Sequence, residues 1–292
     1  MRLSRLFLVA LVLAAAAIVA VALALPVVLG PHAIPGEEVL VTVPQGAGAA
    51  QAAAVLEDAG VVRSALAVRA LAAWRGDTRR LQAGEYLFRG SPTPDEVIDR
   101  LVAGEVVLHA VTLPEGLSRS EIVALLRQAP IDVVGDLDAF TGRGEWVRDL
   151  DPSADDLEGY LFPDTYRFAR GVAAEEVIRE MVGRFREVAT GVLGEMGPPP
   201  GSVREWVTLA SLIEEETGLA DERRRVSAVF HNRLERNMLL QCDPTVLYAL
   251  AREGIDVGES LARRLGFDHP YNTYLYKGLP PGPIASPGEA AL

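Results

Sequence analysis

The feature that most constrains this chain is an uninterrupted apolar run near its N-terminus. Residues 6–29 carry no charge and are almost entirely Leu, Val, Ala and Ile. A helix that crosses a bilayer needs roughly 20 such residues, so the run predicts a transmembrane helix. Arg2 and Arg5 precede the run, whereas the first charge after it is Glu37. The positive-inside rule therefore places the N-terminus in the cytoplasm and everything after Pro31 outside it.

A cleaved signal peptide is the alternative interpretation of this run. Residues 22–24 (ALA) offer a small-residue cleavage site. The apolar core of a signal peptide is only about 7–15 residues long, however, which is shorter than the run seen here. We therefore expect residues 1–30 to be a short cytoplasmic end followed by an uncleaved anchor, in a single-pass protein of the bacterial cell membrane. Both interpretations place the rest of the chain outside the cytoplasm.

The net charge and the cysteine and histidine content of the chain exclude several classes of binding site and cross-link. The chain has a formal charge of −12, and the part that follows Arg2 and Arg5 carries −14. Nucleic-acid binding relies on cationic groups that neutralise phosphates, so this balance argues against it. Cys242 is the only cysteine, which excludes an intramolecular disulfide. The four histidines are scattered without metal-ligand spacing, and neither a metal site nor a cofactor is expected.

The segment after the anchor predicts a small α+β unit over residues 31–105. Residues 38–43 (EVLVTV) and 83–88 (AGEYLF) have strand character, and two helical patterns lie between them. Ser64 is placed to cap the second of these helices. Pro94 occupies a first-turn position of a further helix, where its missing N–H does no harm.

A short echo links this unit to the rest of the chain. Residues 41–46 read VTVPQG, and residues 111–116 read VTLPEG, 70 positions later. A helical pattern follows each copy. Both copies predict a strand that ends at Pro, a glycine turn and a helix that folds back. Duplication and independent origin explain the echo equally well.

The remaining chain, residues 106–292, predicts a mainly helical, mixed α/β domain. Residues 132–157 have a weak, acidic pattern and are expected to form loops. Amphipathic spacing predicts four helices, and the tail from Gly278 reads as a Pro/Gly-rich loop. The expected helices cover residues 174–192, 202–217, 221–236 and 244–252.

Three glutamates end the second of these helices, in the segment 209–217 (LASLIEEET). Helical spacing turns Glu215 away from the apolar stripe toward solvent, whereas Glu214 and Glu216 lie at its two edges. A carboxyl group against apolar neighbours keeps its proton to a higher pH, so either of these two could serve as a general acid. Spacing does not choose between them, and all three could instead be ordinary helix-end carboxylates.

Two later segments offer polar groups that suit sugar hydroxyl and acetamido groups. Residues 230–234 (FHNRL) and 241–248 (QCDPTVLY) supply amide, hydroxyl and charged side chains, and residues 271–274 (YNTY) add aromatic rings around an amide. Asp243 could instead cap the helix that begins at Pro244. The YNTY segment could equally be a packed loop. A GxSxG elbow, a phosphate-binding loop and a complete dinucleotide fingerprint are all missing from the sequence, which leaves acid/base chemistry by carboxylates.

In this order, the motifs resemble the endolytic murein transglycosylase (YceG-like) family. The resemblance covers nearly the whole chain, including an N-terminal region similar to that family's LysM-like subdomain. It implies that Glu214 is the catalytic glutamate. The motifs that carry the resemblance are LEGYLFPDTY (157–166), LASLIEEET, VSAVFHNRL (226–234), LQCDPTVLY (240–248), YNTY and GLPPGPIASPG (278–288). The positions that it implies line the same region are Asn232, Arg233, Gln241, Asp243, Thr245, Tyr271, Asn272 and Tyr274. Glu216, at the other edge of the helix, is a further substrate-binding candidate from its spacing.

The resemblance also implies a reaction and its partners. The expected reaction cleaves the bond between N-acetylmuramic acid and N-acetylglucosamine within peptidoglycan strands and leaves 1,6-anhydro ends. The expected partners are peptidoglycan strands, the cytoplasmic membrane and peptidoglycan synthases. Cys242 stands where the family usually has a small hydroxyl residue. Family members usually continue beyond the end of this sequence, which suggests a C-terminal truncation. Two alternatives are a hydrolytic muramidase that pairs Glu214 with Asp243 or Asp164, and a non-catalytic glycan-binding or scaffold protein.

Overall fold

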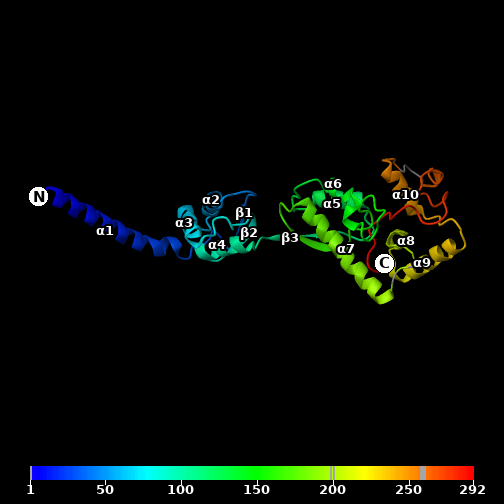
Figure 1. Cartoon of the computed structure of the whole chain (residues 1–292), viewed down its shortest axis with the longest axis horizontal. Coiled ribbons are helices and arrows are strands. Elements are labelled where there is room, and N and C mark those ends of the chain that lie inside the picture. Colours follow the sequence, from blue (N-terminus) through cyan, green and yellow to red (C-terminus); the bar gives the residue numbers. More distant parts are fainter. Residues whose placement is uncertain (1, 198, 200, 257–260) are drawn as a thin grey trace. The chain divides into compact units, whose positions relative to one another are not determined.

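The computed structural model describes a helix-rich α+β protein (Figure 1). It describes residues 2–197, 199, 201–256 and 261–292, except for the side chains of residues 2–10, 17, 18, 21 and 263. The chain divides into two compact units. Unit 1 comprises residues 1–108 together with 169–171, and unit 2 comprises residues 109–168 and 172–292.

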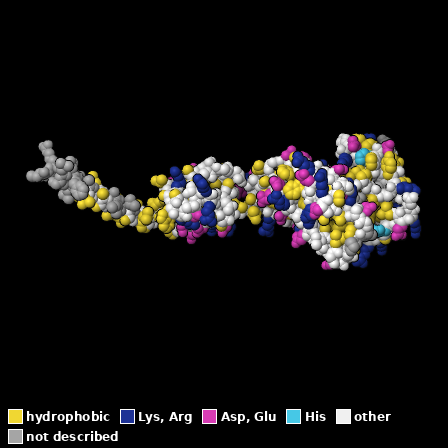
Figure 2. Space-filling model, viewed as in Figure 1, with side chains coloured by type: hydrophobic (Ala, Val, Ile, Leu, Met, Phe, Trp, Pro, Cys, Tyr) yellow, Lys and Arg dark blue, Asp and Glu magenta, His cyan; other side chains and the backbone are white. Residues whose placement is uncertain are grey.

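Helix α1 (Arg2–Leu29) begins unit 1 and contains Pro26. Hydrophobic side chains follow the described part of this helix (Figure 2), and Leu11, Leu13 and Leu23 are more than half exposed. The predicted anchor, residues 6–29, falls partly on side chains outside the description. Within the described residues, no helix combines the length and the apolar character that a membrane crossing requires.

The predicted order strand, helix, helix, strand is confirmed in unit 1. Strand β1 (Glu38–Val43) pairs antiparallel with β2 (Gly84–Arg89), so that Glu38 faces Arg89 and Val43 faces Gly84. Helices α2 (Ala49–Asp58) and α3 (Ala65–Arg75) lie between them in the chain. Ser64 caps α3 as predicted, because its hydroxyl accepts the N–H of Ala67.

Helix α4 (Pro94–Ala103) completes the helices of unit 1 and starts with a reciprocal capping box between Thr93 and Glu96. Its inner face joins the core that β1, β2, α2 and α3 build, with Phe88 and Ile98 fully buried. Residues 169–171 return to this unit, where Arg170 pairs with the buried Glu85 at 3.1 Å.

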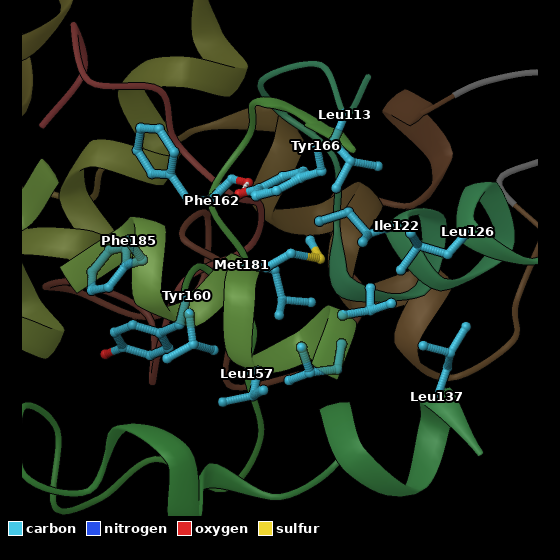
Figure 3. Packing of buried hydrophobic residues seen from close by; sticks show 14 of the residues in the cluster. Leu113, Ile122, Leu126, Leu137, Leu157, Tyr160, Phe162, Tyr166, Met181 and Phe185 are labelled. Atoms are coloured by element: carbon cyan, nitrogen blue, oxygen red, sulfur yellow. Dashed lines mark hydrogen bonds between the residues drawn. The ribbon is translucent and has the colours of Figure 1, made fainter. Parts of the chain in front are cut away.

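Unit 2 has a first core whose buried residues lie between Val111 and Val207. Strand β3 (Leu108–Thr112) pairs with β4 (Thr165–Ala169), and helices α5 (Arg119–Gln128) and α7 (Ala174–Met196) contribute side chains to the same core. Figure 3 shows Met181 among Ile122, Leu157 and Tyr166, and the edge of the Tyr160 ring against Phe185.

Part of the expectation for this region is wrong. Residues 132–157 are not all loop, because α6 (Leu137–Thr141) and the 3-10 helix η1 (Gly144–Val147) form there. Each is at most five residues long, too short for an amphipathic period to show in the sequence. Strand β4 was not expected either. Its alternation of buried Tyr166 and Phe168 with more exposed neighbours spans only five residues and follows an aromatic-rich turn.

The C-terminal part of unit 2 builds a second core from α8 (Val203–Glu216), α9 (Ala220–Glu235) and α10 (Asp243–Arg252). A short 3-10 helix, η2 (Leu261–Arg263), precedes the C-terminal loops. Helix α8 belongs to both cores, since Val207 packs in the first and Leu212 in the second. Helix α8 therefore joins the two cores.

Candidate active site

Helix α8 holds the three glutamates in the orientations that the spacing predicts. A capping box fixes its first turn, because Ser202 accepts the N–H of Glu205 and the Glu205 carboxylate accepts that of Ser202. From this start the helical period brings Glu214 onto the buried side, with 9% of its surface exposed, whereas Glu215 and Glu216 are exposed. The buried position distinguishes Glu214 from its neighbours as a candidate acid.

Each oxygen of the Glu214 carboxyl group has its own hydrogen-bond donor. The Arg223 side chain donates through Nη2 to Oε1 at 3.2 Å, and the backbone N–H of Gly288 donates to Oε2 at 3.1 Å. Arg223 lies near the start of α9, and Gly288 lies in the C-terminal tail. Glu214 is thus held from two sides in a buried setting, which fixes the direction of its carboxyl group.

The tail reaches Glu214 because two neighbours bind its backbone. The Ser211 hydroxyl accepts the N–H of Ile284 at 3.1 Å. Ser286 exchanges backbone bonds with the turn after β3, since Gly116 N–H donates to Ser286 O at 3.0 Å and Ser286 N–H donates to Leu117 O at 2.9 Å. The loop 278–288 (GLPPGPIASPG) is therefore held against the site by these backbone hydrogen bonds.

The second copy of the echo supplies a residue that sequence reasoning missed. Glu115, in VTLPEG, accepts a hydrogen bond from Arg223 Nη2 at 3.3 Å, through the same nitrogen that binds Glu214. The first copy, VTVPQG, carries Gln45 at the matching position. The difference between Gln45 and Glu115 at this matching position is the sequence signal that could have identified Glu115. Arg223 was also missed, because it lies within a run of three arginines.

Glu215 packs over the glycine turn beside this site. A Cβ at Gly116 would lie 2.7 Å from Glu215 Oε1, and Gly116 has a φ of +80°, so both space and backbone conformation favour glycine there. The packing around the Glu215 carboxyl group and the carboxylates of Glu121 and Glu214 raise its pKa to about 7. The residue as a whole is exposed, as the helical spacing predicts, while its carboxyl group packs over the turn at Gly116.

Several of the predicted substrate-binding residues come together on the other edge of α8. Glu216 accepts the thiol hydrogen of Cys242 at 3.4 Å, and Asp243 accepts the Tyr274 hydroxyl. Thr245 is fully buried and bonds Thr273 at 2.9 Å, and the backbone N–H of Gln241 donates to Thr273 at 3.1 Å. Asp243 does not cap α10, because Cys242 is the N-cap residue and makes no side-chain cap bond.

The other predicted residues have separate surroundings. Asn272 is fully buried and donates to the carbonyl groups of Leu265 and Phe267, which holds its own loop together. Arg233 donates to the carbonyl of Leu240 and so ties the end of α9 to the next segment. Asn232 is exposed on α9, and the ring of Tyr271 lies tilted against that of Tyr248, with ring centroids 4.9 Å apart.

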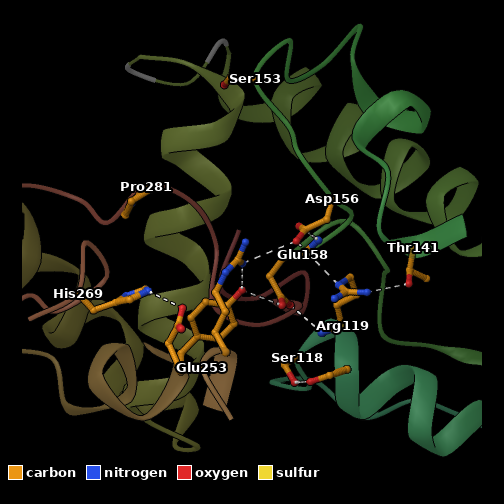
Figure 4. A network of polar contacts seen from close by, with 12 residues as sticks. Ser118, Arg119, Thr141, Ser153, Asp156, Glu158, Glu253, His269 and Pro281 are labelled. Atoms are coloured by element: carbon orange, nitrogen blue, oxygen red, sulfur yellow. Dashed lines mark hydrogen bonds and ion pairs between the residues drawn. The ribbon is translucent and has the colours of Figure 1, made fainter. Parts of the chain in front are cut away.

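A second buried carboxyl group, Glu158, lies in the motif LEGYLFPDTY and was not singled out from the sequence. Figure 4 shows its network with Arg119 and Asp156. Glu158 accepts the N–H of Arg119 at 2.7 Å and the Tyr248 hydroxyl at 3.1 Å, and so links the start of α5 to α10. Burial raises the pKa of Glu158 to about 8, with a smaller contribution from the Asp156 carboxylate.

A large apolar groove of 830 Å³ lies beside the site, but Glu214 is not among the residues that line it. Its walls come from the end of α7, from α8 and α9 and from the C-terminal residues, with Trp206, Ile213 and Leu279 among them. We place the candidate active site at Glu214 and not in this groove, because Glu214 is the buried carboxyl group of α8 with a hydrogen-bond donor on each oxygen.

Comparisons with known proteins show the family of the chain. The model of the YceG-like family matches residues 41–292. The chain belongs to the YceG-like family. A protein of Bacillus subtilis named endolytic murein transglycosylase is 33% identical over 86% of this chain and 74% of its own length. A protein of the same name from Streptococcus pneumoniae is 30% identical over 87% of this chain, which spans only about half (51%) of that relative.

A solved structure supports the assignment. The crystal structure of a YceG-like protein from Listeria monocytogenes has a TM-score of 0.56 and 30% sequence identity, over 88% of this chain and 89% of that one. The matched region includes both units, so the family resemblance extends beyond the short motifs around α8.

Proposed function

We propose that this chain is a lytic transglycosylase that cleaves peptidoglycan strands internally, with Glu214 as general acid and base. The observation that carries the proposal is the burial of Glu214 between two donors, in a family whose relatives are named endolytic murein transglycosylases. A buried, oriented carboxyl group is what proton transfer to a glycosidic oxygen requires.

In the proposed reaction, Glu214 begins in its protonated form. It donates the proton to the oxygen between N-acetylmuramic acid and N-acetylglucosamine, the bond from that oxygen to the muramic C1 breaks, and the N-acetylglucosamine part leaves as an alcohol. The Glu214 carboxylate then takes the proton of the muramic 6-hydroxyl group, while the oxygen of that hydroxyl group bonds to C1. The ring closes to the 1,6-anhydro form, and Glu214 is protonated again without consumption of water.

This route needs one carboxyl group, because the substrate supplies the nucleophile. Hydrolysis of a glycoside ordinarily uses two carboxyl groups on either side of the bond. The two aspartates considered as partners for Glu214 are engaged elsewhere. Asp243 accepts the Tyr274 hydroxyl, and Asp164 binds Arg184 Nε at 2.8 Å. These contacts favour the transglycosylase over the muramidase.

Mass spectrometry of the cleavage products tests the proposal. Purified full chain in detergent should convert peptidoglycan strands into fragments with 1,6-anhydro ends, and Glu214→Gln should abolish this conversion while the fold persists. Glu195→Gln is the matched control and should keep full activity, because Glu195 is an exposed glutamate near the end of α7 and lies outside the candidate site. Reducing ends in place of anhydro ends would refute the transglycosylase reaction. Full activity of Glu214→Gln would refute the residue assignment.

We further propose that residues 1–30 anchor the protein in the cell membrane with the N-terminus in the cytoplasm, and that unit 1 is a LysM-like glycan-binding unit. The apolar run 6–29 and the preceding Arg2 and Arg5 support the first part. The strand, helix, helix, strand order supports the second. An anchored enzyme would act on new strands close to the synthases that make them.

A further inference from the structure

One guanidinium group in unit 2 connects two carboxyl groups. Arg223 Nη2 lies 3.2 Å from Glu214 Oε1 and 3.3 Å from Glu115 Oε2. We infer that Arg223 is the positioning residue that orients Glu214, and that Glu115 acts through Arg223 by holding it in place. The inference rests on the proposed role of Glu214 and assigns functions to two residues of the same site.

The chain turns sharply to bring Arg223 to this place. Thr217 ends α8, and its hydroxyl oxygen accepts the N–H of Leu219 at 3.1 Å, so that α9 starts immediately and runs back past the end of α8. Within the run of arginines, Arg223 has a side chain only 16% exposed, whereas Arg224 and Arg225 are exposed. A single arginine of the three therefore faces the carboxyl groups.

Glu115 reaches Arg223 because a glycine makes room for it. A Cβ built on Gly288 would lie 1.9 Å from Glu115 Oε1, a separation that real atoms do not adopt. The N–H of the same Gly288 donates to Glu214 Oε2. Glu214 is thus surrounded by Glu115, Arg223 and Gly288. A side chain at position 288 would displace Glu115 without removing any charged group from the site.

The remaining hydrogen-bonding capacity of Arg223 supports a functional role. Its Nε is buried and has no hydrogen-bond partner among the residues that the structure describes. A buried unsatisfied donor costs stability, and such costs are typical of functional sites. When Glu214 carries the proton that it donates, it is neutral. The positive charge of Arg223 is then balanced by the negative charge of Glu115.

Positioning has a measurable consequence for the reaction. A misplacement of a catalytic group by about 1 Å can reduce the rate by about 100-fold without an effect on substrate binding. Loss of Arg223 should therefore lower kcat and leave KM nearly unchanged. Because Glu115 acts through Arg223, its removal should have no effect once Arg223 is gone.

Steady-state kinetics on uncrosslinked peptidoglycan strands, with the full chain in detergent, tests these statements. We expect Arg223→Met to lower kcat by about 100-fold, Arg223→Lys by about 10-fold and Glu115→Gln by about 10-fold, each with KM within about threefold of the unsubstituted chain. The matched control Arg224→Met should stay within about twofold. The double variant with Arg223→Met and Glu115→Gln should be no slower than Arg223→Met alone.

Two results would overturn the inference. One is an Arg223→Met chain with an unchanged kcat while Glu214→Gln is inactive. The other is a double variant about 1000-fold slower, the product of the single effects, which would mean that Glu115 acts independently. If Arg223→Met does not fold, the same cycle with Arg223→Lys and Glu115→Gln decides. Full activity of Glu214→Gln would instead refute the proposed function, so the two failures are distinguishable.

Discussion

Replacement of Glu158 by Gln should make the protein more stable at neutral and alkaline pH. Glu158 has 6% of its surface exposed, and burial raises its pKa from 4.5 to about 8. In the unfolded chain the same group loses its proton near its ordinary pKa. Between these two values the folded state therefore binds more protons than the unfolded state, and the free energy of unfolding falls as the pH rises.

The size of the effect follows from the two pKa values. At about 1.4 kcal/mol per pH unit, a rise from 4.5 to about 8 corresponds to a loss of about 4 kcal/mol between acid pH and pH 8. Gln has the shape of the protonated acid, and it can still accept from Arg119 and bond Tyr248. The Glu158→Gln chain should therefore match the unsubstituted chain near pH 5 and exceed it by up to about 4 kcal/mol at pH 8.

Urea unfolding of the full chain in detergent, measured at half-unit steps from pH 5 to 8 by tryptophan fluorescence, provides the assay. Trp146 and Trp206 report on unit 2, in which Glu158 lies. The exposed Glu195 offers a matched control, since Glu195→Gln removes the same charge from the end of α7. The reasoning is refuted if Glu158→Gln and the unsubstituted chain show the same slope of unfolding free energy against pH.

Three further perturbations test other parts of the structure. Gly116→Ala should lower activity by about 10-fold or more and should also lower the melting temperature, because a φ of +80° strains alanine and its Cβ would meet Glu215. Unchanged kinetics and an unchanged melting temperature would contradict this. Glu215→Gln should keep activity within about threefold, since the residue is exposed and Gln keeps the shape of the side chain; a loss as large as that of Glu214→Gln would show that the wrong glutamate is assigned. A reporter that works only outside the cytoplasm, fused at the C-terminus, should be active in cells, whereas a cytoplasmic reporter fused after Gly36 should not.

Local patterns predicted the regular elements well. The bounds of β1 agree with the expectation from sequence, Ser64 caps α3, and Pro94 is the first residue of α4, as the helix signals indicate. These features depend on the periodicity of a few neighbouring residues and on cap chemistry, both of which are local. Helix α6 and strand β4 were missed because each is only five residues long, so that their formation depends on the core they pack against.

The candidate site was only partly predictable for the same reason. Helical spacing placed Glu214 and Glu216 on opposite edges of α8 and Glu215 toward solvent, which the structure confirms. Spacing did not choose Glu214, because that choice depends on Arg223 and on Gly288, which is 74 residues further along the chain. Glu158 was missed because its burial results from packing between α5 and α10, which no short motif records.

The two copies of the echo carry different side chains before the turn glycine. Both copies end a strand at Pro and turn at a glycine with positive φ, at Gly46 and Gly116. In unit 1 the residue before the glycine is Gln45, a neutral amide. In unit 2 it is Glu115, which binds the arginine beside Glu214. Since the turn itself is the same, the difference lies in one side chain and in the helix it meets. The backbone motif provides a rigid position, and the charge placed on it determines whether that position contributes to the site.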